Sequence, residues 1–115
     1  MHTADELRRV VLSLPEAEER ETWGHPTFRV RDKMFMGMAG DETTVTVKAS
    51  KEAQAALVGS EPDTFFVPSY VGQHGWVGVR LEHVDAAELA ELIEDAWRAT
   101  APKRVVKAYD AADAG

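Results

Sequence analysis

Apolar residues recur along the chain at helical spacing in three segments. The first segment ends at Pro15 and the second follows Ser50, whose side chain can cap a helix over residues 51–58. The third follows Asp85 and ends near Pro102. The apolar stripes of the first and third helices are Leu7, Val10, Val11 and Leu14, and Leu89, Leu92, Ile93, Ala96 and Trp97. The pattern therefore predicts three helices.

Five segments alternate polar and apolar residues or are rich in β-branched residues, as strands are. They are residues 27–31, 34–39, 43–48, 64–67 and 75–81. The connections between the first three are too short for crossovers, so these strands are expected to be antiparallel. The order α-β(3)-α-β(2)-α predicts an α+β fold, a two-layer α/β sandwich in which helices cover one face of an antiparallel sheet.

The remaining segments lack such periodicity. Residues 16–26 are acidic and then rich in turn residues, so they are predicted to be irregular. Residues 1–102 are expected to form a single domain, and residues 103–115 a flexible C-terminal tail.

Strand alternation sorts the side chains between the two faces of the sheet. The outward set contains Arg29, Arg31, Lys48 and Arg80 against Glu82, with Trp76 among them. In residues 34–39, Met34, Met36 and Met38 share one side and Phe35 the other, and the pattern does not decide which side is buried.

The distribution of charge along the chain bears on whether this outward face could bind phosphates. The whole chain has a net charge of −7, which argues against binding to phosphates. The acidic residues, however, concentrate on the last helix and in residues 16–21, which leaves the sheet face basic around Trp76. Basic residues beside an aromatic ring are typical of nucleic-acid platforms. The alternatives are that these charges serve solubility and discourage edge pairing, and that Trp76 packs under the loop of residues 68–74.

Few residues in the sequence suggest catalysis. The chain has no cysteine, and its four histidines do not have the spacing of metal ligands. No serine lies in a nucleophile motif, and no glycine-rich phosphate loop is present. We therefore expect no enzymatic activity, metal or cofactor. Two loops could line a groove at one end of the sheet, through Trp23 and His25 in one loop and Tyr70 and His74 in the other.

Several short motifs, in their order and spacing, resemble the MmcQ/YjbR family of small bacterial proteins. The motifs are Gly24-His25-Pro26-Thr27-Phe28-Arg29-Val30, Lys33-Met34-Phe35, Val47-Lys48, Gly75-Trp76-Val77-Gly78-Val79 and Leu89-Ala90-Glu91-Leu92-Ile93. The resemblance implies the same α-β(3)-α-β(2)-α fold, related in shape to CyaY-like and secretion-chaperone-like domains. It also implies DNA binding, which is the label the family often carries, and it supplies no catalytic residues. Many members have a Lys- or Arg-rich stretch where this chain has residues 71–75.

These observations lead to two functional hypotheses. The first is a non-enzymatic domain that binds DNA weakly and without sequence specificity, through Arg29, Arg31, Lys48, Arg80 and a stacking Trp76. The second is a protein-interaction or chaperone-like module that uses the same face. No apolar run approaches the roughly 18 residues of a membrane helix, and a cytoplasmic location is expected.

Overall fold

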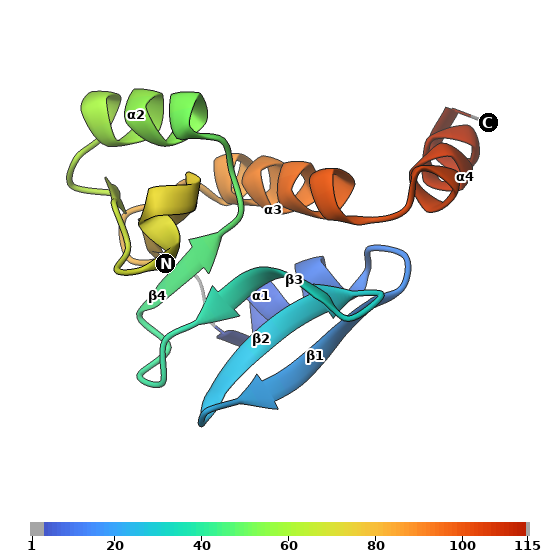
Figure 1. Cartoon of the computed structure of the whole chain (residues 1–115), viewed down its shortest axis with the longest axis horizontal. Coiled ribbons are helices and arrows are strands. Elements are labelled where there is room, and N and C mark those ends of the chain that lie inside the picture. Colours follow the sequence, from blue (N-terminus) through green and yellow to red (C-terminus); the bar gives the residue numbers. More distant parts are fainter. Residues whose placement is uncertain (1–3, 115) are drawn as a thin grey trace.

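The structure, a computed structural model, describes residues 4–114 and is an α+β fold built on a six-stranded sheet (Figure 1). The strands are β1 (Ala17–Thr22), β2 (His25–Val30), β3 (Lys33–Met38), β4 (Thr44–Val47), β5 (Phe65–Phe66) and β6 (Val77–Arg80). Their order across the sheet is β1-β2-β3-β4-β6-β5, and every neighbouring pair is antiparallel. The predicted antiparallel sheet is confirmed.

The helices are α1 (Ala4–Leu12), α2 (Lys51–Ser60), α3 (Ala86–Thr100) and α4 (Lys103–Ala114), with a 3-10 turn, η1 (Val71–His74). Ser50 and Asp85 cap α2 and α3, because their side chains accept hydrogen bonds from the backbone N–H groups of Ala53 and Glu88. Helix α3 contacts β3 and β4, while α1 contacts β1 and α3.

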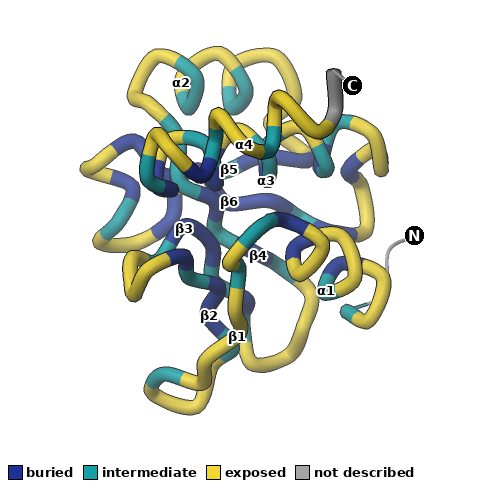
Figure 2. The backbone as a smooth tube through the Cα atoms, turned by 90° about the vertical axis from the view of Figure 1, so that its right-hand side faces the viewer, coloured by how far each residue is buried: buried dark blue, intermediate teal, exposed yellow. Residues whose placement is uncertain are grey.

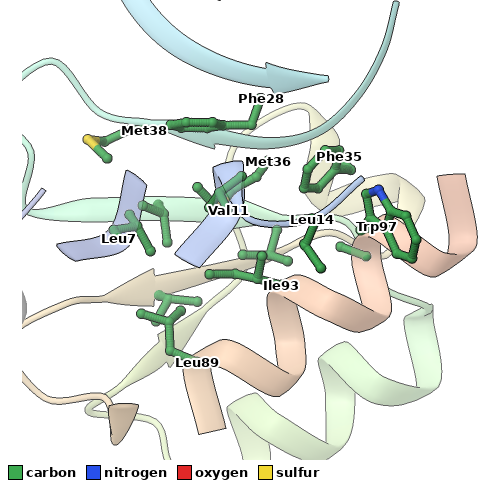
Figure 3. Packing of buried hydrophobic residues seen from close by; sticks show 14 of the residues in the cluster. Leu7, Val11, Leu14, Phe28, Phe35, Met36, Met38, Leu89, Ile93 and Trp97 are labelled. Carbon is green, nitrogen blue, oxygen red and sulfur yellow. The ribbon is translucent and has the colours of Figure 1, made fainter. Parts of the chain in front are cut away.

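The core lies between the sheet and the pair α1 and α3 (Figure 3). Phe28 and Met36 face Val11 and Ile93 across this layer, and all four side chains are fully buried. In β4 and β6 the alternating valines are buried, as strand alternation predicted. We call this the inner face of the sheet, and the opposite side the outer face.

A bulge decides the orientation of β3. Arg29 pairs with Met34 but Phe28 pairs with Met36, so Phe35 is an extra residue in the ladder. Phe35 and Met36 are both buried as a result, and Met34 is half-buried on the outer face. Simple alternation could not resolve this segment because the bulge interrupts its period.

Two segments differ from the sequence-based expectation. Residues 17–22 form β1, although they were predicted to be irregular, because an edge strand can be charged on both sides and lacks an apolar alternation. Residues 103–114 form α4 rather than the irregular tail that was expected. Val105 belongs to the core and Val106 and Tyr109 pack partly buried against it, and the alanines and charged residues between them make the apolar repeat weak in the sequence. In Figure 2 the exposed backbone of β1 contrasts with the buried β3 and β6.

Candidate functional site

The outer face of the sheet has a small-residue centre bordered by cations. Thr27, Gly37 and Thr46 lie side by side on β2, β3 and β4, because Thr27 pairs with Gly37 and Gly37 pairs with Thr46. These residues, with Met34 and Thr44, line a shallow hollow of about 360 Å³. Small side chains keep the floor low, so groups approaching the sheet can reach the half-buried Thr44 and Thr46, while the hydroxyl of the buried Thr27 donates to the carbonyl oxygen of Arg20.

Arg29 lies across the outer face beside this hollow. Its guanidinium donates to Thr27 Oγ1 at 3.3 Å, to Thr22 Oγ1 at 3.2 Å and to the carbonyl oxygen of Asp32 at 3.2 Å. All three acceptors are neutral, so these hydrogen bonds orient the guanidinium of Arg29 without neutralising its charge. A fixed, half-buried guanidinium is well suited to accept an anion.

Arg80 is held on the other side of the hollow by an aromatic ring. Its guanidinium carbon lies 4.7 Å from the centroid of Phe66, and its Nη1 donates to the carbonyl oxygen of Pro62 at 3.2 Å. Phe66 in turn covers Gly78, where a Cβ atom would lie 2.3 Å from the ring. Gly78 therefore allows Phe66 to lie flat, and Phe66 places Arg80.

Lys48 directly follows β4 and, by alternation with Thr46, is on the same face. Strands two apart in a sheet are separated by about 10 Å, which gives the distance between the backbones carrying Lys48 and Arg29. Lys48 lies four residue steps from Thr44, the partner of Arg80, so the backbones of Lys48 and Arg80 are roughly 13 Å apart along the strand direction. Arg29, Lys48 and Arg80 thus surround the hollow.

Trp76 and Arg31 do not lie free on the outer face, where the sequence predicted them to contact nucleic acid. Trp76 is only 8% exposed, and its carbonyl oxygen accepts a hydrogen bond from Gln54 at 2.6 Å, so it is a buried anchor rather than an outward stacking ring. Arg31 lies in the β2–β3 turn and forms an ion pair with Glu16, which raises the pKa of Arg31. The burial of Trp76 agrees with the alternative that its ring packs under the loop of residues 68–74.

Strand β1, which the sequence did not predict, adds charges of both signs to the outer face. Glu18 pairs with Arg29 and Arg20 pairs with Thr27, so both side chains share the outer side with their partners. Arg20 contacts Glu18 and Asp32, each at 2.7 Å. The face is therefore less basic near β1 than the sequence indicated, and its uncompensated charge is centred on β2, β4 and β6.

The two loops expected to form a groove lie at opposite ends of the sheet. Trp23 and His25 lie at the β1–β2 turn, on the level of the C-terminal end of β3. Tyr70 and His74 precede Val77, which pairs with Val47 at the other end of β4. Figure 1 shows the β1–β2 turn at the lower tip, away from η1 in yellow. The two pairs therefore do not meet in one groove, and His25 instead lines the hollow of the outer face.

Where side chains are described, in residues 4–112, no group of three or more His, Asp and Glu side chains is placed to hold a metal ion. In the same part of the chain, no helix has the length and apolar character needed to cross a membrane. The residues that sequence reasoning missed are Phe66, which positions Arg80, and the threonines of the hollow. Their only sequence signal was a polar outward side in the strands.

Comparison with known proteins places this fold in a family. Residues 12–99 match the YjbR family. The chain belongs to the YjbR family. The uncharacterised protein Rv2570 of Mycobacterium tuberculosis is 31% identical, over 95% of this chain and 96% of the relative, and Mb2600 of Mycobacterium bovis matches equally. Protein DR2400 of Deinococcus radiodurans, with a DUF419 domain, has a solved structure with a TM-score of 0.76 and 25% identity, covering 84% of this chain and 77% of that one.

Proposed function

We propose that the outer face of this YjbR domain binds the phosphate backbone of nucleic acid, weakly and without reading sequence. The observation that carries the proposal is the arrangement of Arg29, Lys48 and Arg80 around the threonine-lined hollow. Among the side chains of residues 4–112, no carboxylate forms an ion pair with any of the three. The role is non-enzymatic, and we place it in the cytoplasm.

Electrostatics sets the expected strength of this binding. Three phosphate contacts give a slope of about −3 for the logarithm of the binding constant against the logarithm of salt concentration. With Trp76 buried, base stacking contributes nothing at that position. The net charge of −7 opposes binding further, so the complex should form only at low salt.

Fluorescence anisotropy with a labelled 20-base-pair duplex, at several salt concentrations, tests the proposal. Lys48→Glu should weaken binding at least tenfold at low salt, because it replaces an attractive charge with a repulsive one. Lys107→Glu makes the same charge change on the exposed surface of α4, away from the outer face, and should weaken binding far less. Equal losses in the two variants, or no binding at low salt, would overturn the proposal.

A second candidate is a protein-interaction module, and two exposed aromatic residues favour it. Trp23 is 94% exposed and Tyr70 is 88% exposed, at the two ends of the sheet. Large aromatic side chains in water are typical of surfaces that bind protein partners. Sedimentation analysis of the wild type and of Trp23→Ser and Tyr70→Ser tests whether the domain self-associates through them. A wild type that remains monomeric, or self-association that is as strong in both variants as in the wild type, would contradict this candidate.

A further inference from the structure

Helix α4 is fixed against α3 by several different contacts. Val105 is 7% exposed and belongs to the core, and the ring of Tyr109 packs edge-on against Trp97 with centroids 5.1 Å apart. At the surface, Arg98 donates to both carboxylate oxygens of Asp110, at 3.1 and 2.7 Å. These contacts make α4 a defined wall of the molecule.

A groove of about 460 Å³ lies between α4 and the turn that follows α1. Its apolar lining consists of Pro15, Val105, Ala108, Tyr109 and Ala112. Glu16, Arg31 and Arg104 complete the lining with charged groups. Its volume falls within the usual range of small-molecule sites, roughly 300–1,000 Å³. Figure 1 shows the loop between α1 and β1 close to α4 and the end of α3.

The charges of the groove do not cancel. Glu16 accepts hydrogen bonds from Nε and Nη2 of Arg31, and this contact, followed by the nearby charge of Arg104, lowers the pKa of Glu16. Arg104 itself forms no ion pair with the described side chains of residues 4–112. Two guanidinium groups therefore face one carboxylate, which leaves an excess of one positive charge beside an apolar wall.

We infer that this groove binds a linear monocarboxylate, with the carboxylate at Arg104 and the hydrocarbon chain along α4. One negative charge on the ligand matches the one excess positive charge. Val105, Ala108, Tyr109 and Ala112 are spaced i, i+3, i+4 and i+7, so they form a stripe along the helix. At a rise of 1.5 Å per residue the stripe is about 10 Å long, which suits an extended alkyl chain.

The direction of the ligand follows from the position of the charges. Arg104 is the second residue of α4, where the positive end of the helix dipole also favours an anion. Ala112, at the other end of the stripe, is exposed and uncharged. The carboxylate therefore belongs at the N-terminal end of α4 and the methyl end beyond Ala108.

Titration of the full chain with octanoate, followed by calorimetry and by the NMR signals of Val105, Ala108 and Ala112, tests the inference. Arg104→Gln should weaken octanoate binding about tenfold, as expected for one charge-assisted hydrogen bond. Ala108→Gln should also weaken binding, because the longer side chain fills the groove while remaining compatible with a helix. Lys107→Gln, which removes a charge from the same helix without lining the groove, is the matched control.

The uncharged analogue octanamide separates the two parts of the site. It should bind more weakly than octanoate to the wild type, and equally weakly to Arg104→Gln. Unchanged signals, or the same loss in Lys107→Gln as in Arg104→Gln, would overturn the inference. Far-UV circular dichroism of each variant checks that α4 remains folded. The outcome does not depend on nucleic-acid binding, which uses the opposite layer of the molecule.

Discussion

The indole Nε1 of Trp97 donates a hydrogen bond to the carbonyl oxygen of Pro15 at 2.9 Å, across 82 positions of sequence. Trp97 is fully buried, and its ring also contacts Tyr109 of α4. One side chain thus connects the turn after α1 with both C-terminal helices. Figure 3 shows Trp97 beside Phe35 and Leu14, where the two layers meet.

Trp97→Phe is expected to lower the free energy of unfolding by about 1–3 kcal/mol, because it leaves the Pro15 carbonyl without this donor. Urea denaturation followed by circular dichroism measures the loss. Trp23→Phe is the control, since Trp23 is 94% exposed and a surface change of this kind costs within about 0.5 kcal/mol. Similar stabilities for the two variants would show that the Trp97–Pro15 bond contributes little.

Gly78→Ala is expected to destabilise the domain by about 1–3 kcal/mol, the usual cost of overpacking. The added Cβ would lie 2.3 Å from the ring of Phe66 and would displace both Phe66 and Arg80. In the background Phe66→Ala the same glycine substitution should cost much less. A double-mutant cycle measures this coupling, and additive effects would contradict the proposed contact.

Trp23→Asn is expected to raise the free energy of unfolding by about 0.5–1 kcal/mol. Trp23 has a φ of +55° and Gly24 a φ of +79°, as in the two-residue turn that favours Asn-Gly. Thermal and urea unfolding measure the gain, with Trp23→Ala as a control that removes the ring but keeps the backbone cost. A loss of stability in Trp23→Asn would show that the exposed indole makes stabilising contacts.

The Arg98–Asp110 pair should contribute stability that depends on pH. The hydrogen bonds from Arg98 lower the pKa of Asp110, so the folded state favours the charged carboxylate. This contribution is present above the unfolded pKa of about 3.9 and is lost as pH falls through the lowered value. The stability difference between wild type and Asp110→Asn should therefore shrink between about pH 4 and pH 2. In an Arg98→Ala background, the stability difference caused by Asp110→Asn should no longer shrink between these pH values.

Much of the fold could be predicted from periodicity, because burial repeats at fixed intervals in regular elements. The stripe through Leu89, Ile93 and Trp97 indicated α3, and the alternating valines of β4 and β6 indicated which side faces the core. Strand β1 and helix α4 were missed for the converse reason. As an edge strand and a peripheral helix, they bury too few residues to give a clear repeat. In the structure β1 pairs with β2, and α4 packs on Trp97 through Tyr109.

Some properties of the candidate site could likewise be predicted from the sequence, and others could not. By itself, the sequence determined that Arg29, Lys48 and Arg80 share a face, since this follows from alternation along single strands. That the acidic segment of residues 17–22 forms β1 and places Glu18 on the same face was decided by the tertiary structure. Only the tertiary structure decided that Trp76 is buried and that Arg31 is paired with Glu16. It also decided that the groove beside α4 exists. These properties depend on contacts between distant segments, and local spacing does not record such contacts.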